Sequence, residues 1–231
     1  MDFGGTLCVV DLCHSERRGR SLEVMVTLRT QQLVAVPDVP PLDVDVPVGA
    51  TAALVAEPGV GTSVVRVVVG LVAPVSGRIL VGERDVTDLP PPRRRIGYVP
   101  AGGALLPHLT VGRNISYGQR RRQRVHDVAD DWASTLVDRL ELAPTLGLRP
   151  HQISEAQRFR VALARAMACL PEVLVVDLPT PVDGVRLTPL LDRLSPPDSP
   201  RVTVLIGSGH PEVLAEVPTQ VPVRAADGAT A

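Results

Sequence analysis

The sequence predicts an α/β domain built mainly on a parallel sheet, with a helical insertion near residues 102–170. Three short apolar runs are typical of parallel strands that are buried on both faces. These runs are TAALVA at 51–56, EVLVVD at 172–177 and RVTVLIG at 201–207. A fourth segment, SEAQRFRVALARAMACL at 154–170, has an apolar face at helical spacing and begins with Ser154 as its N-cap.

The first part of the chain predicts strands that precede the parallel sheet. Residues 21–30 and 40–49 alternate apolar and polar side chains, as half-buried strands do, and Gly49 marks a turn. We therefore expect an antiparallel β part here. Residues 1–20 and 229–231 are predicted to be tails, and residues 21–228 to form a single domain.

The segment SVVRVVVGL at 63–71 can be interpreted in two ways. Its valines favour a strand by propensity. The glycine-rich turn before it and the stop at Gly70 favour a helix, which is our prediction.

The remaining elements follow from similar signals. They are a strand pair with a proline-rich turn at 77–95, a strand at 96–100, a helix capped by Thr110, helical structure over 119–149, and a last strand with a hairpin turn at 221–228. Four arginines in the polar helical part form a charge run, which predicts a solvated face: Arg120, Arg121, Arg122 and Arg124.

The composition narrows the class of protein. The chain has 231 residues, of which 45% are hydrophobic and only 2% aromatic, so the core is expected to be aliphatic. No apolar run reaches the ~18 residues of a membrane span, and the first residues lack the basic leader of a secretory signal. A net charge of -1 gives no general attraction to nucleic acid, which we do not expect as a partner.

The cysteines and the basic residues are also informative. Three cysteines, an odd number, fit a reducing compartment better than a disulfide framework. Cys8, Cys13 and His14 lack a fourth metal ligand at a recognised spacing, so we interpret them as incidental residues of an N-terminal extension. All 24 basic residues are arginine, and the chain therefore has no lysine to place beneath a phosphate.

Four stretches in order carry a resemblance to a known family. They are EPGVGTS, RRRIGYVPAGGALLPHLTVGRNISYG, ISEAQRFRVALARAM and VLVVDLPTPVD. Together they resemble the ATP-binding subunit of ABC transporters, and DLPPPRRRIGYVP and LLPHLTV are most similar to the molybdate and sulfate importer type. The resemblance covers roughly residues 21–228.

The resemblance implies a P-loop NTPase-like fold that uses ATP and Mg²⁺. It also implies a site shared between two such subunits, as a homodimer or a heterodimer, and a transmembrane permease as partner. The expected location is the cytoplasm, peripheral on the inner face of the cell membrane.

The phosphate loop of the family, G-x-x-x-x-G-K-[ST], matches this sequence in two ways. Without a gap, Gly61 is kept, Thr62 replaces the lysine and Ser63 takes the magnesium position. With the lysine deleted, which we prefer because a loop absorbs a deletion better than a helix, Thr62 and Ser63 match the Ser-Thr pair. The resemblance implies nucleotide contacts from Gly59, Gly61, Thr62 and Ser63, with magnesium held by Ser63 and Asp177.

Several residues depart from the family at this loop and beyond it. Glu57 adds a negative charge, and Pro58 removes an N–H donor. Ala101 replaces the glutamine that follows GYVP in the family. Leu178 occupies the position of the glutamate that activates water, and leucine cannot accept a proton.

The LSGGQ-type signature and the switch histidine are altered as well. Ser154 and Gln157 are retained and are implied to contact nucleotide, whereas Glu155 replaces a glycine. Gly209 occupies the histidine position, and a one-residue shift would bring His210 there.

These departures predict a degenerate ABC ATP-binding subunit with weak or no ATP hydrolysis and a structural or regulatory role beside a permease. One alternative is an active ATPase that energises import of an oxyanion such as molybdate or sulfate, with His210 in the switch position. Another is a remnant without function.

Overall fold

The computed structural model describes residues 26–37, 39–57, 59–117, 126–195 and 201–223. Some predictions lie outside these ranges: both tails, the group of Cys8, Cys13 and His14, the arginine run at 120–124, and the hairpin turn expected near the C-terminus.

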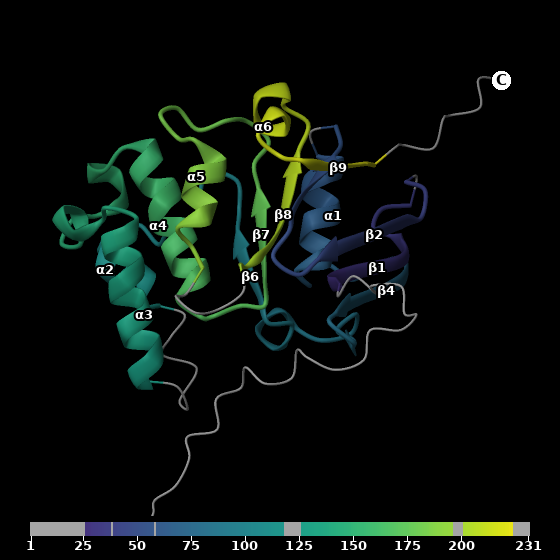
Figure 1. Ribbon diagram of the computed structural model, residues 1–231, viewed down its shortest axis with the longest axis horizontal. Helices are drawn as coiled ribbons and strands as arrows, with labels where there is room; N and C mark the ends of the chain where they lie inside the picture. The colour runs from purple at the N-terminus through teal and green to yellow at the C-terminus, as the bar shows by residue number, and fades with distance from the viewer. Residues whose placement is uncertain (1–25, 38, 58, 118–125, 196–200, 224–231) are drawn as a thin grey trace, which may run out of the picture.

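A five-stranded parallel sheet forms the centre of the fold (Figure 1). In sheet order its strands are β6 (Ile96–Val99), β7 (Val173–Asp177), β8 (Thr203–Ser208), β3 (Thr51–Val55) and β9 (Thr219–Pro222). All four pairings are parallel, and every residue of β7 and β8 is buried. The three apolar runs that predicted buried parallel strands are therefore confirmed. A last strand was predicted to begin at residue 221; the strand in this region, β9, begins earlier, at Thr219, and lies at the sheet edge beside β3.

A four-stranded antiparallel sheet confirms the expected β part near the N-terminus. In sheet order its strands are β2 (Leu42–Pro47), β1 (Val26–Val34), β4 (Ser76–Val81) and β5 (Arg84–Asp85). The strand β1 continues past residue 30, where the prediction ended it. The pair Gln31 and Gln32 breaks the apolar alternation, and a register shift with Gln32 at φ +47° lets the strand continue.

Six α-helices and three short 3₁₀ helices complete the described fold. They are α1 (Val60–Val68), α2 (Val111–Ile115), α3 (His126–Arg139), α4 (Glu155–Met167), α5 (Leu187–Asp192), α6 (Pro211–Ala215), η1 (Pro91–Arg93), η3 (Ala143–Thr145) and η4 (Pro150–Gln152). The valine-rich segment is a helix, as predicted, and Thr110 and Ser154 cap α2 and α4. None of the helices in the described ranges combines the length and hydropathy needed to cross a membrane.

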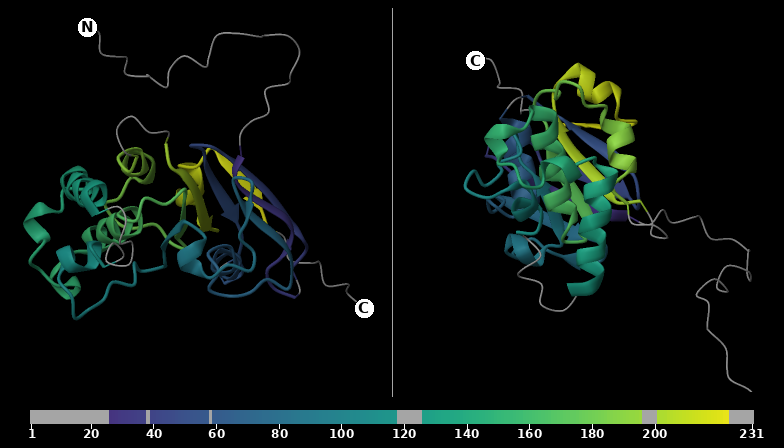
Figure 2. Two further views of the ribbon diagram at one scale, coloured as in Figure 1. Left: turned by 90° about the horizontal axis from the view of Figure 1, so that it is seen from below. Right: turned by 90° about the vertical axis from the view of Figure 1, so that its left-hand side faces the viewer.

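The parallel sheet separates two hydrophobic clusters. The helix α1 and the antiparallel sheet cover one face, whereas α5 and the helical insertion, which includes α4, lie on the other (Figures 1 and 2). Alternate residues of β7 belong to different clusters: Val173 and Val175 pack toward α1, and Leu174 and Val176 pack toward α4. Each strand at the centre therefore contributes to both cores.

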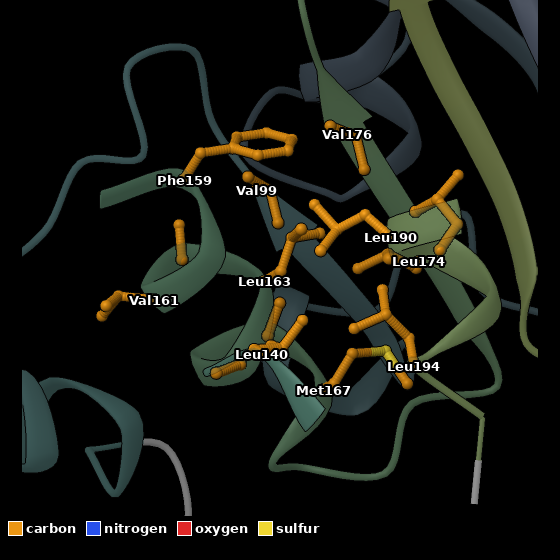
Figure 3. Packing of buried hydrophobic residues seen from close by; sticks show 14 of the residues in the cluster. Val99, Leu140, Phe159, Val161, Leu163, Met167, Leu174, Val176, Leu190 and Leu194 are labelled. Carbon is orange, nitrogen blue, oxygen red and sulfur yellow. The ribbon is translucent and has the colours of Figure 1, made fainter. Parts of the chain in front are cut away.

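The hydrophobic cluster beneath α4 surrounds the candidate site. Figure 3 shows Leu163 and Met167 of α4 among Leu174, Leu190 and Leu194. The single tryptophan of the chain, Trp132 of α3, belongs to this cluster. It is buried and donates its indole N–H to the carbonyl of Met167 at 3.2 Å. This bond ties α3 to α4, the helix that begins in the signature sequence.

Candidate functional site

The glycine turn between β3 and α1 folds as the resemblance predicts, but its donors face inward. Gly59 lies at φ +95° and precedes α1 directly. The backbone N–H groups of Val60 and Gly61 both donate to the carbonyl of Glu57, at 3.2 and 3.3 Å. In a phosphate loop, N–H groups at a helix N-terminus point at the anion. Here these two are satisfied within the loop.

Thr62 is the hydroxyl that faces Asp177. Its Oγ1 lies 3.1 Å from Asp177 Oδ1, whereas the Ser63 hydroxyl donates back to the carbonyl of Gly59 at 2.7 Å. Thr62 thus stands where the alignment with a deleted lysine places the magnesium-site hydroxyl. Ser63, the residue expected beside Asp177, is turned away from it.

Asp177 is the one ionisable residue of β7, at its carboxyl end, and its residue surface is only 4% exposed. Burial raises the pKa of this carboxyl. The Thr62 hydroxyl, the Arg66 charge and the backbone of Ala101 act in the opposite direction. The groups that act on this carboxylate therefore come from two segments, α1 with Thr62 and Arg66, and the connector after β6 with Ala101.

The residues present do not fit the phosphate chain of ATP, although they offer oxygens suited to a divalent cation. Thr62 and Asp177 supply two such oxygens. No lysine exists to neutralise the phosphates, and two of the loop N–H groups are used by Glu57. The charge of Arg66, one turn past Thr62 on α1, lowers the pKa of both the Asp177 carboxyl and the Tyr98 hydroxyl.

Leu178, at the position of the family's glutamate, is part of the hydrophobic core. Its residue surface is 7% exposed, and its N–H donates to the carbonyl of Gly207 at 2.9 Å. Phe159 of α4 belongs to the same cluster and is 5% exposed. Figure 3 shows its ring pointing from α4 toward Val176, the residue before Asp177. The surroundings of Leu178 are therefore suited to an apolar side chain.

The connector after β6 is fixed to α4. Ala101 is exposed and presents a methyl group where the family has glutamine. Arg165 of α4 donates to the carbonyls of Gly103 and Ala104, both at 2.8 Å. This segment therefore has a structural attachment, while its side chain at 101 cannot coordinate a metal or orient water.

The signature residues Ser154 and Gln157 are engaged with each other. The Ser154 hydroxyl accepts from the Gln157 N–H at 3.2 Å, and the Gln157 Oε1 accepts from the Ser154 N–H at 2.9 Å. This capping box satisfies donors at the start of α4. Glu155, in the first helical turn, lines a cavity of ≈ 90 Å³ together with Asp177 and Leu178.

His210 serves as a helix cap. Its Nδ1 accepts from the backbone N–H of Glu212 at 3.3 Å, at the start of α6. At the neighbouring Gly209, any Cβ would collide with the carbonyl oxygen of Ala56. No side chain therefore fits at 209, where the ungapped alignment places the histidine.

Sequence reasoning missed two parts of this site. Phe159 was not linked to Leu178, although a phenylalanine two residues after the signature glutamine is one of only two in the chain. The inward turn of the loop had no signal in the sequence, since it depends on carbonyl directions at Glu57 and Gly59.

Comparisons with known proteins agree with this architecture. The family described as ABC transporter matches residues 39–181. The molybdate/tungstate import ATP-binding protein WtpC of Archaeoglobus fulgidus is 40% identical over 140 residues, which cover 60% of this chain and 58% of WtpC. The sulfate/thiosulfate import ATP-binding protein CysA of Mycobacterium bovis is 40% identical over 139 residues, covering 60% of this chain and 40% of CysA. The chain thus spans less than two thirds of either relative.

Two solved structures share the fold. One is cbiO1 from Clostridium perfringens, part of the ABC transporter complex cbiONQ, with a TM-score of 0.67 at 19% identity over 87% of this chain and 86% of that one. The other is the ATP-binding cassette MJ0796, a dimer bound to ADP and Pi, with a TM-score of 0.69 at 19% identity over 86% of this chain and 95% of that one.

Proposed function

Because this chain belongs to the ABC transporter family, we propose that it is an ATP-binding-subunit-like component of an importer whose own nucleotide site hydrolyses ATP weakly or not at all. The observation that carries the proposal is the inward-turned loop, in which Glu57 takes the N–H groups of Val60 and Gly61. The buried Leu178 supports it, because the residue that follows Asp177 is an apolar side chain that cannot accept a proton from water.

The partners in this proposal are a transmembrane permease and a second ABC subunit, as a homodimer or a heterodimer. The chain would act in the cytoplasm, peripheral on the inner face of the cell membrane. The relatives named as import ATP-binding proteins support an importer. The helical insertion, within which Trp132 ties α3 to α4 and Arg165 ties the connector after β6 to α4, would keep a structural or regulatory role.

Calorimetric titration of the full chain with Mg-ATP tests the loss of the site. We expect no saturable heat below about 1 mM, since a lost charge pair near the phosphates is worth about 4 kcal/mol at an effective dielectric of about 20. Thr62→Val should behave like the parent chain in this titration. A micromolar dissociation constant in the parent that Thr62→Val weakens would overturn the proposal.

The preserved contact between Thr62 and Asp177 favours a second candidate function. In it, the chain is an active ATPase that energises import of an oxyanion such as molybdate or sulfate. That function requires ATP turnover in the presence of the permease, and Asp177→Ala should abolish the turnover. Equal phosphate release by the parent and the variant would exclude it.

A further inference from the structure

A second cavity lies where the loop after β7 passes between α4 and α6. Its volume is ≈ 310 Å³, at the lower end of the roughly 300–1,000 Å³ of small-molecule sites. Seven apolar side chains line it: Phe159, Leu178, Pro181, Val182, Val185, Leu187 and Val213. No described residue of the glycine turn or of α1 is among its lining residues, although it shares Phe159, Leu178 and Val182 with the smaller cavity at Asp177.

Three carboxylates and one guanidinium complete the lining. Glu216 is held in place, because its Oε2 accepts from the Thr188 N–H at 3.1 Å and its Oε1 lies 3.7 Å from Arg186 Nε. Asp183 and Glu212 are exposed, and within the described ranges neither carboxylate has a hydrogen-bond or ion-pair partner. Among the lining residues, the guanidinium of Arg186 pairs with Glu216, which leaves the carboxylates of Asp183 and Glu212 unpaired within the described ranges.

We propose that this cavity binds a small organic cation with an apolar body, of the arylalkylammonium class. The apolar body would pack against Phe159, Leu178 and Val213, where contact with water is already excluded. The ammonium group would lie at the rim between Asp183 and Glu212, as a charge-assisted hydrogen-bond donor. An anion of the same shape meets uncompensated like charge and is disfavoured.

This proposal does not rest on the proposed function. Leu178 gives the cavity its apolar floor whether or not the phosphate loop binds nucleotide. A chain that binds Mg-ATP can still bind the cation, and a chain that binds neither refutes only the present inference.

The test is a titration of the full chain with 2-phenylethylammonium, followed by methyl NMR. We expect saturable shifts of the Val182, Val185 and Val213 methyl groups. The neutral isostere 2-phenylethanol should bind about tenfold more weakly, because it lacks the charge-assisted bond. Equal affinity for the two ligands, no saturable binding, or shifts confined to other parts of the chain would overturn the proposal.

Substitution of single carboxylates distinguishes a specific contact at the rim from the general attraction between the ligand and a negatively charged protein. Asp183→Asn and Glu212→Gln should each weaken the cation by about three- to tenfold and leave the alcohol unchanged. Glu83→Gln is the matched control, since Glu83 is an exposed carboxylate at the β4–β5 turn, away from the cavity. Both rim positions are exposed, so the variants are expected to fold, which circular dichroism checks. If Glu83→Gln lowered the affinity for the cation as much as the rim variants, a specific role of Asp183 and Glu212 would be refuted.

Discussion

Asp177 and Leu178 are neighbours in sequence but lie in opposite surroundings. The Asp177 carboxyl meets a hydroxyl and a backbone N–H, whereas Leu178 packs with Phe159 in the apolar cluster. The two positions that would hold a metal-binding acid and a general base in this family therefore differ in what they can accommodate. Substitutions at each position test that difference.

Leu178→Glu is predicted to destabilise the chain by about 2–4 kcal/mol, because it buries a carboxyl group without a partner. Burial would raise the pKa of the introduced carboxyl. The loss should therefore be smaller at pH 5, where more of that carboxyl is protonated, than at pH 8. Urea unfolding at pH 5 and at pH 8 measures the loss of stability. Leu178→Met, which conserves volume, should cost less than about 1.5 kcal/mol. Undiminished stability at pH 8 together with new ATP hydrolysis would contradict the prediction.

Asp177→Asn is predicted to raise the melting temperature at pH 7. Burial raises the pKa of Asp177 above 3.8, so the stability that its protonated form contributes is present below that value and is lost as pH rises through the folded pKa. The neutral amide side chain of the variant does not ionise, so the variant keeps this stability at pH 7. For a chain of this size, each kcal/mol of unfolding free energy raises the melting temperature by about 2–4 °C. Melting curves from pH 3 to 8 measure the difference, with the exposed Asp138→Asn as control. A less stable variant at pH 7 would show that the charged carboxylate is needed.

Part of the site was predictable at this scale. The motif order pointed to Thr62, Asp177 and Leu178, and the structure brings Thr62 and Asp177 within 3.1 Å of each other. The choice between Thr62 and Ser63 was not predictable, since it depends on which hydroxyl turns back onto the helix. The structure resolves it through the bond from Ser63 to Gly59.

At the scale of elements, α1 shows how context overrides propensity. Six of its nine residues are valine or threonine, which favour strands, yet the turn at Gly59 and the end at Gly70 define a helix. The end is reinforced by Arg94, which is 2% exposed. Its guanidinium donates to the carbonyls of Val67 and Val68, at 2.9 and 3.0 Å.

Arg94→Met is predicted to lower the free energy of unfolding by about 3–5 kcal/mol. The guanidinium also donates to the carbonyls of Leu89 and Thr87, at 2.8 and 2.6 Å, so its loss leaves buried carbonyl groups without a donor. Urea denaturation measures the loss. Arg95→Met is the matched control: Arg95 is exposed and, among the described residues, its side chain pairs with Glu172 alone, so the substitution should cost less than about 1 kcal/mol. Equal losses for the two neighbours would refute a specific role for Arg94.

The positions of the strands in the sequence were more predictable than the strands with which they pair. Apolar runs identified β3, β7 and β8 because all three are buried on both faces. The pairing of β9 with β3 was not foreseen, since β9 is mostly exposed and its short sequence does not specify a neighbour. Similarly, the helical periodicity of residues 119–149 did not indicate that α3 ends at Arg139.

At the scale of the whole molecule, the parallel sheet joins the two hydrophobic clusters. Val175 and Leu205 face α1, while Val176 and Ile206, the next residues along each strand, face α4. Loss of packing on one face therefore disturbs strands that the other face needs. This arrangement favours one cooperative unit, although a chain of 231 residues exceeds the roughly 150 below which two-state unfolding is usual.

Val68→Ala is predicted to shift the unfolding of the distant tryptophan as much as that of the whole chain. Val68 is fully buried in the α1 cluster, and its truncation should cost about 2 kcal/mol through lost apolar contact and a small cavity. Trp132 lies in the other cluster, so its emission reports on the far face of the sheet. If the sheet couples the clusters, the urea midpoints by Trp132 emission and by far-ultraviolet circular dichroism fall together in the variant. An emission midpoint that stays at the parent value while the circular dichroism midpoint falls would mean that the helical side unfolds separately.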